Sequence, residues 1–299
     1  MNTIFYGNGI NRLSKNNPSW DGLLTGIGGT HLSETIPNTL KYEAIVMNKP
    51  YKEPDGYLVT SNHTRILTAS GNALVVRGER TELMVKQRIA KDLPKLESND
   101  IYDKMVSLPV EHYITTNYDN AILAALNNEF ERVRNTRQEK IYSIRRHYLL
   151  GERKTLWPIH GNIDSPASIM LGYDHYCGAL SKIEGYVKGS YDMPDVGNTE
   201  PIMKRLKDGI GVPLSWIDLF FISDVHIIGF GMKYEESDIW WLLNKRKRIK
   251  RKDGDLIKNR IIFYPDYDIG DMRQILQGFD VEICELNSYD SEISVKIEK

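Results

Sequence analysis

Four segments of the chain place glycine or polar residues directly after a short apolar run. If each run is a strand of a parallel sheet, these residues meet at its carboxyl edge, where open α/β folds bind their ligands. A Gly-x-Gly turn lets the backbone approach a pyrophosphate closely, whereas an amide and an imidazole can position water and move a proton. The pattern therefore predicts a nucleotide-binding site at this edge of the sheet. The segments are Gly7-Asn8-Gly9-Ile10-Asn11, Thr115-Thr116-Asn117-Tyr118-Asp119, His160-Gly161 and Gly229-Phe230-Gly231.

Simpler interpretations of these motifs stay open. The first Gly-x-Gly lacks the third glycine of the usual dinucleotide fingerprint, so a tight turn explains it equally well. Asp119 could cap the following helix as readily as it could contact a ligand. Asn117 precedes that cap and has no obvious turn role. His160 ends a predicted strand as Asn117 does, which favours a functional role for both.

The elements that must position these residues are short β-branched strands separated by helical stripes. One stripe runs through residues 122–133 after Asp119, another follows Ser237, and a short helix begins at Met272 and ends at Gly278. Glu235, Glu236 and Asp238 stand at the start of the second helix. Alternating strands and helices predict an α/β, Rossmann-like, doubly wound and mainly parallel sheet. The expected strands are residues 3–6, 113–115, 156–159, 169–171, 225–228, 260–264 and 281–286.

We expect residues 1–299 to form one domain that carries an insertion. Residues 20–108 predict a mainly helical inserted module between the first two core strands, with strand signal only at 57–59 and 73–76. Residues 185–213 are rich in Gly, Asp and Pro and predict a long surface excursion.

Composition excludes several classes of protein. With 39 Lys and Arg against 40 Asp and Glu, the net charge of −1 argues against a uniformly basic nucleic-acid binder. No apolar stretch approaches the ~20 residues of a membrane span, and the start of the chain has no export signal, so we expect a cytoplasmic protein without membrane contact. Cys177 and Cys284 are too few for a four-thiolate zinc site, the histidines show no ligand spacing, and we assign no metal.

One strongly cationic run contrasts with the neutral total. Residues 245–252, from Lys245 to Lys252, hold seven cations in eight positions. Cations are favoured near the carboxyl end of a helix, so a solvated helix face is the preferred interpretation. Binding of nucleic acid or an acidic partner is the minority alternative.

The order of these motifs resembles the sirtuin superfamily, and most of all its bacterial branch, the sirtuin-like NAD hydrolases of anti-phage defence. The resemblance extends from residue 4 to about 265. Its most specific part is Thr-Thr-Asn-Tyr-Asp, followed by His160-Gly161 41 residues after Asp119. It implies a Rossmann-like NAD-binding domain with a smaller inserted helical module.

The resemblance also implies a role for each matching residue. Gly7, Asn8, Gly9 and Asn11 would line the dinucleotide phosphates, and Gly229 and Gly231 would border the adenosine half. Asn117 would hold the catalytic water or the nicotinamide ribose, and Asp119 would contact the nicotinamide amide. His160 would bind a ribose hydroxyl or act as general base. The chain departs from the family at Asn8, Asn11 and Gly231, where Ala, Ser and Ser are common.

We therefore expect an NAD hydrolase that releases nicotinamide and ADP-ribose and, once activated, depletes cellular NAD in abortive anti-phage defence. A non-catalytic sensor of NAD or ADP-ribose is the alternative from another class. A protein deacylase or ADP-ribosyltransferase is less favoured, because the two Cys-x-x-Cys pairs of zinc-bearing deacylases are missing. The resemblance also suggests a homo-oligomer and a separate activator or partner protein.

Overall fold

The main body of the protein is built on a seven-stranded sheet with the strand order β13-β12-β11-β1-β6-β8-β7. The computed structural model describes residues 1–14, 19–28, 33, 35–48, 51–52, 57–59, 64–67, 75–77, 81–93, 98–126, 141–150, 154–193 and 197–286. Every neighbouring pair of strands is parallel except β7 with β8. The predicted Rossmann-like α/β class is confirmed. The strands are β1 (Asn2–Tyr6), β6 (His112–Thr115), β7 (Tyr148–Leu150), β8 (Lys154–Pro158), β11 (Asp224–Ile228), β12 (Ile261–Tyr264) and β13 (Val281–Ile283).

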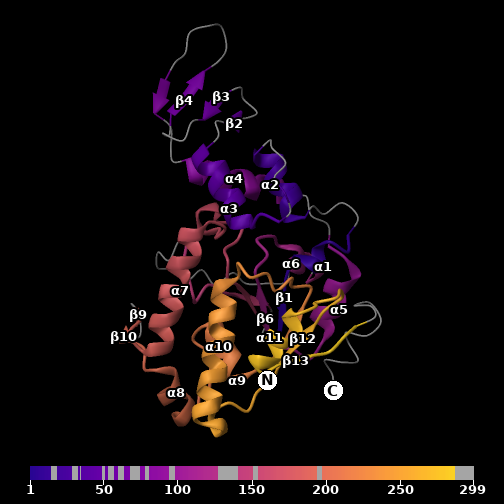
Figure 1. Cartoon of the computed structure of the whole chain (residues 1–299), viewed down its shortest axis with the longest axis vertical. Helices are drawn as coiled ribbons and strands as arrows, with labels where there is room; N and C mark the ends of the chain where they lie inside the picture. Colours follow the sequence, from indigo (N-terminus) through magenta and orange to yellow (C-terminus); the bar gives the residue numbers. More distant parts are fainter. Residues whose placement is uncertain are drawn as a thin grey trace.

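Helices cover both faces of this sheet (Figure 1), and successive residues of β1 pack into two different apolar cores. Phe5 belongs to one apolar core with residues of α7 to α11, whereas Ile4 and Tyr6 belong to another with residues of α1, α5 and α6. Burial on both faces explains why the strands are nearly continuous apolar runs. The first layer contains α7 (Tyr173–Lys188), α8 (Ile202–Asp208), α9 (Trp216–Ile222), α10 (Ser237–Lys252) and α11 (Met272–Gly278); the second contains α1 (Asn8–Asn11), α5 (Asp100–Ser107) and α6 (Ala121–Ala125).

The insertion consists of helices next to the main body and a small sheet beyond them (Figure 1). α2 (Trp20–Gly28), α3 (Asn38–Asn48) and α4 (Thr81–Asp92) share an apolar core, to which Tyr118 and Leu171 of the main body contribute. The insertion is less helical than expected, because an antiparallel four-stranded sheet lies between α3 and α4, and α5 packs in the main body instead. Its strands are β2 (Tyr51–Lys52), β3 (Tyr57–Val59), β4 (Thr64–Leu67) and β5 (Val75–Arg77).

Three other expectations need correction or lie partly outside the described residues. Residues 169–171 are not a strand: they follow the 3-10 helix η2 (Pro166–Ser168), and Ile169 and Leu171 are apolar because they pack against the insertion. Residues 185–213 are not one surface excursion, because residues 185–188 complete α7 and a hairpin and α8 follow. Met193 and Ile202 of that stretch are buried in the core. The predicted helix at 122–133 is present as α6, and its part beyond residue 126 lies outside the described residues. The hairpin strands are β9 (Asp192–Met193) and β10 (Gly197–Asn198).

The cationic run forms the last two turns of α10, but it is not a uniformly solvated face. Arg246 is fully buried and bonds Asp280 at 3.1 Å. Lys247 and Lys250 pair with the same carboxylate at 3.2 and 2.6 Å. Three of the seven cations therefore form ion pairs that link α10 to Asp280, the residue directly before β13. No helix in the described part of the chain is long and apolar enough to cross a membrane.

Candidate active site at the carboxyl edge of the sheet

The loops after β1 and β11 meet where the sheet reverses its winding. From β1 the chain proceeds to β6 and β8 on one side, and it later returns to β11 on the other side of β1. Ligands of open α/β sheets bind outside the carboxyl ends of the strands at such a switch point. The two predicted glycine motifs flank this reversal.

Gly7, Gly9 and Gly229 allow these two loops to touch. The Gly7 amide donates to the carbonyl of Ile228 at 3.2 Å, and the Gly9 amide donates to the carbonyl of Gly229 at 2.7 Å. A Cβ on Gly9 would lie 2.6 Å from the Gly229 oxygen, and Gly229 itself has a left-handed φ of 55°. A Cβ on Gly231 would make only an ordinary contact at 3.8 Å. The packing of the two loops thus requires glycine at positions 7, 9 and 229. Contacts of these motifs with phosphate or adenosine stay predictions.

Asn11 and Asp119 form a buried pair between the loops that follow β1 and β6. The Asn11 Nδ2 donates to Asp119 Oδ2 at 2.7 Å and to Asn8 Oδ1 at 3.1 Å, and the Tyr102 hydroxyl donates to Asn11 Oδ1 at 2.5 Å. Asp119 Oδ1 accepts from the amide of Ala121 at 2.9 Å. Burial raises the pKa of Asp119, against these hydrogen bonds, which lower it. Asp119 therefore accepts a hydrogen bond from the first amide of α6, whose N-cap residue is Asn120, and its contact with a nicotinamide amide stays a prediction.

Asn117 lies just beyond β6 with 2% of its surface exposed. Its backbone amide donates to Thr115 Oγ1 at 3.0 Å, which fixes the turn. Within the described part of the chain, the Asn117 side chain interacts with the Tyr102 hydroxyl and lowers its pKa, but that hydroxyl donates its hydrogen bond to Asn11 Oδ1 and leaves Oδ1 and Nδ2 of Asn117 without a well-formed one. An unpaired buried amide is costly and rare, so it is a good candidate for a group that binds water or substrate.

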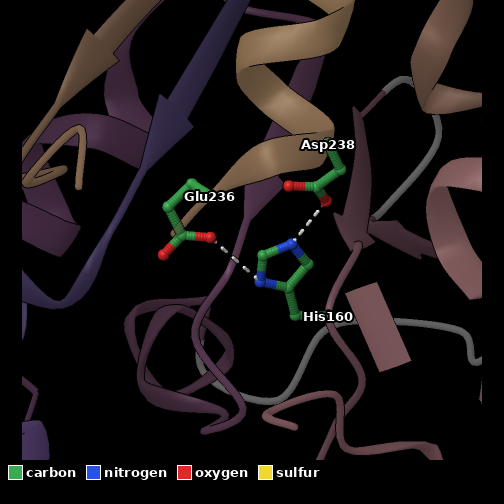
Figure 2. A group of neighbouring side chains, drawn as sticks. All are labelled: His160, Glu236 and Asp238. Carbon is green, nitrogen blue, oxygen red and sulfur yellow. Dashed lines mark hydrogen bonds and ion pairs between the residues drawn. The ribbon is translucent and has the colours of Figure 1, made fainter. Parts of the chain in front are cut away.

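His160 is held between two carboxylates at the end of β8 (Figure 2). Its Nε2 lies 2.8 Å from Oδ2 of Asp238 in the first turn of α10, and its Nδ1 lies 3.8 Å from Oε2 of Glu236. The ring is 2% exposed and meets Tyr176 edge to face at 5.3 Å between centroids. Gly161, with a φ of 103°, turns the chain immediately after the imidazole.

This arrangement fixes the tautomer and the proton affinity of His160. An ionised Asp238 only accepts hydrogen bonds, so Nε2 carries the proton and the lone pair of Nδ1 faces Glu236. Burial lowers the pKa of His160, but the charge and hydrogen bond of Asp238 and the charge of Glu236 together raise it above its ordinary value. Burial raises the pKa of Glu236 to about 7. A proton can therefore be taken up here near neutral pH.

A cavity of about 30 Å³ lies beside His160 and Glu236. Thr116 and Tyr118, which flank Asn117, line it from the main body. A cavity of this size holds about two water molecules, whereas ligand pockets measure roughly 300 Å³ or more. The insertion contributes Trp20, Asn38 and Thr39 to the lining.

His160, Glu236 and Asp238 also have the chemistry of metal ligands. Their donor atoms lie within 4.8 Å of one another. The direct 2.8 Å contact between His160 and Asp238 has the length of a hydrogen bond, and this bond already occupies one ring nitrogen. We therefore interpret the group as a proton-handling cluster. The thiols of Cys177 and Cys284 are free.

The structure brings six of the predicted site residues together as two groups of three at the carboxyl edge of the sheet. Gly7, Gly9 and Gly229 form the first, and Asn8, Asn11 and Asp119 form the second. His160 lines the cavity, but Asn117 is not among its lining residues. No sequence motif pointed to Tyr102, Tyr176, Asn38 or Thr39. The only signal near the last two is Pro37-Asn38-Thr39, which is typical of the start of a helix.

The comparison with protein families matches the part of the chain that carries most of this site. The family model described as the SIR2-like domain matches residues 111–276, which is more than half of the chain. The chain belongs to the SIR2-like domain family. The matched part of the SIR2-like domain contains Asn117, Asp119, His160 and the β11 loop, while the first glycine motif and the insertion precede it. No curated protein matches the chain.

Proposed function

We propose that this SIR2-like domain hydrolyses NAD to nicotinamide and ADP-ribose. Membership of the family is consistent with NAD-related activity. The observation that carries the finer proposal is the buried pair of His160 with Asp238, 2.8 Å apart, beside a cavity at the carboxyl edge of the sheet. A buried histidine with a fixed tautomer is suited to proton transfer.

Cleavage of the bond between nicotinamide and ribose makes modest demands on a nucleophile. Nicotinamide leaves as a neutral molecule from a cationic substrate, and positive charge develops on the ribose in an oxocarbenium-like transition state. The carboxylate of Glu236, which accepts a hydrogen bond from the Tyr176 hydroxyl at 3.0 Å, can stabilise that charge in its ionised form.

Water must then attack the anomeric carbon and lose a proton. The Nδ1 of His160 has the free lone pair that can accept this proton, while Asp238 stabilises the imidazolium that results. The unpaired amide of Asn117 would hold the attacking water or a ribose hydroxyl. The carbon–nitrogen bond breaks, a carbon–oxygen bond to water forms, and nicotinamide leaves with the bonding electron pair.

The biological side of the proposal is that the activated protein depletes cellular NAD as an effector of anti-phage defence. This part rests on the resemblance of the motif order to the defence branch of the superfamily. Homo-oligomer formation and a separate activator protein belong to the same proposal. Activity that rises with oligomer size across protein concentrations would support it.

The test is to incubate purified protein with NAD over a wide range of protein concentrations and to measure nicotinamide release. Wild type is compared with Asn117→Ala, His160→Ala and the control His147→Ala, whose side chain is outside the cavity lining. We expect release by wild type and the control, and a loss of about 100-fold or more in the other two. Intact NAD bound by the wild-type protein would instead identify a non-catalytic sensor.

A further inference from the structure

The last two turns of α10 carry four cations that form no ion pair within the described part of the chain. The four are Lys245, Arg248, Arg251 and Lys252, whereas the other three cations of the run share Asp280. Lys245 is half-buried and the rest of the four are exposed. Residues 245–258 hold eight cations and two carboxylates. This end of the helix is therefore locally positive, although the net charge of the chain is −1.

Three of these four cations form one row along the helix. Lys245, Arg248 and Lys252 are spaced by three and four positions, which places them on one face of α10 over about 10 Å. The buried side chains of Leu242 and Ile249 hold the same helix against the apolar core. The row is therefore presented to solvent by a helix whose position is fixed by packing.

Two neighbouring elements extend the positive surface. The 3-10 helix η3 (Gly254–Leu256) packs against both α8 and α10, so the end of α8 and the segment after η3 belong to the same end of the main body. Lys207 and Lys258 lie there, are exposed, and also lack an ion pair in the described ranges. The carboxylates on these segments are fewer than the unpaired cations; they are Asp208, Asp253 and Asp255.

This positive surface lies at the end of the main body away from the insertion (Figure 1). α10 begins with Asp238 beside His160 and reaches Lys252 fourteen positions later, about 21 Å along the helix axis. A partner bound at the end of α10 therefore leaves the proposed active site open. The cations there have no part in the chemistry at His160.

The exposed side chains indicate which kind of polyanion fits this surface. Between residues 244 and 258 every exposed side chain is charged. Protein interfaces bury aromatic residues, single-stranded nucleic acids stack their bases on them, and membrane-bound helices insert apolar side chains. This segment exposes no anchor of these kinds. Duplex nucleic acid requires none, because it carries one charge per about 1.7 Å of axis and Lys and Arg alone can bind its backbone.

We propose that the end of α10 binds the phosphate backbone of duplex nucleic acid. The four unpaired cations of α10 contact phosphates, and Lys207 and Lys258 widen the positive surface. Phosphate contacts carry no sequence information, so the binding is independent of base sequence. Release of counterions makes the affinity fall steeply with salt concentration. The inference does not rest on NAD hydrolysis, because it uses no residue of the proposed active site.

The experiment measures binding of a labelled DNA duplex by fluorescence anisotropy, without NAD, at several salt concentrations. Four phosphate contacts predict a slope of about −3.6 for the logarithm of the binding constant against that of the salt concentration. The double variant Arg248→Glu, Lys252→Glu should weaken binding about tenfold or more at low salt and make the slope shallower by about 2. A control, Arg12→Glu with Lys91→Glu, makes the same charge change at exposed residues elsewhere and should bind as wild type does. A duplex of unrelated sequence should bind equally well.

Further measurements keep folding and other polyanions apart from this result. The melting temperature of the Arg248→Glu, Lys252→Glu variant should match wild type, because neither residue forms an ion pair within the described part of the chain. If that variant unfolds, Arg248→Gln with Lys252→Gln should give the same change in slope, since it also removes two phosphate contacts. Polyglutamate and phosphatidylserine vesicles serve as competitors. Absence of duplex binding by wild type at low salt, equal losses in the variant and the control, or preference for either competitor over the duplex would overturn the proposal.

Discussion

The Nε2 of His160 and the Oδ2 of Asp238 lie 2.8 Å apart, although 78 positions separate them in the sequence. His160 lies two residues beyond β8 and Asp238 lies in the first turn of α10, and β8 and β11 are separated in the sheet by β1 and β6. The pair therefore depends on the complete α/β winding. Its chemical consequence is a histidine whose tautomer is fixed and whose proton affinity is raised.

Replacing Asp238 should change the pH profile as well as the rate. Asp238 raises the pKa of His160, so the base form is lost as the pH falls through a value above the ordinary 6.5. In Asp238→Asn the charge is gone, burial lowers the pKa, and the acidic limb of kcat/KM should move to lower pH. The maximal rate should fall about 100-fold, because the tautomer is no longer fixed. A lower rate with an unchanged acidic limb of the kcat/KM profile would show that Asp238 has only a structural role.

Chelation should leave the activity unchanged if the cluster handles protons. His160, Glu236 and Asp238 could hold a divalent ion, with donor atoms within 4.8 Å. We expect the same nicotinamide release before and after treatment with EDTA, and no gain on adding Mg²⁺, Mn²⁺ or Zn²⁺. Loss of activity that one of these ions restores would make the cluster a metal site.

Gly229 and Gly231 should differ sharply in their tolerance of alanine. Gly229→Ala places a Cβ 2.7 Å from Ile10 Cγ1 at a φ of 55°, and should lower the free energy of unfolding by about 2 kcal/mol or more. In Gly231→Ala the Cβ makes only an ordinary contact with Lys233 at 3.8 Å and should change the free energy of unfolding by less than about 0.5 kcal/mol. Denaturant unfolding measures both. Equal stability of the two variants would contradict the close packing of the loops.

Arg246 and Arg248 provide a matched pair within the cationic run. Arg246 is buried against Asp280, so Arg246→Ala leaves a half-buried carboxylate with fewer partners and should cost about 3 kcal/mol. Arg248 is exposed and bonds Asn244 in its own helix, so Arg248→Ala should cost less than about 0.5 kcal/mol. Urea unfolding measures the free energy of unfolding of both variants. Similar losses of stability would show that the buried pair of Arg246 and Asp280 is not a principal stabilising contact.

The sequence predicted the elements whose burial is uniform. Strands such as β6 and β8 are largely buried and read as apolar runs, so their ends, and with them Asn117 and His160, could be located. Residues 169–171 show the limit of this reasoning. An apolar triplet packed against an inserted helix has the same composition as a short strand.

Contacts that depend on the order of the strands could not be predicted. Glu236 and Asp238 were recognisable as acidic residues after a strand, but their approach to His160 follows from how β8 and α10 are brought together. Gly9 and Gly229 suggested phosphate turns, whereas the structure shows that each is also required by the other's loop. Asn38 lies in the insertion, far along the chain from every motif, and only the fold brings it to the cavity.

In the proposed reaction, water accepts the ADP-ribosyl group of NAD at His160. The most direct measurement is the molar balance of nicotinamide and free ADP-ribose, followed by chromatography in parallel reactions of wild type and His160→Ala. We predict equal amounts of the two products from wild type and a loss of both in the variant. Nicotinamide without matching free ADP-ribose, or undiminished release by His160→Ala, would contradict the account.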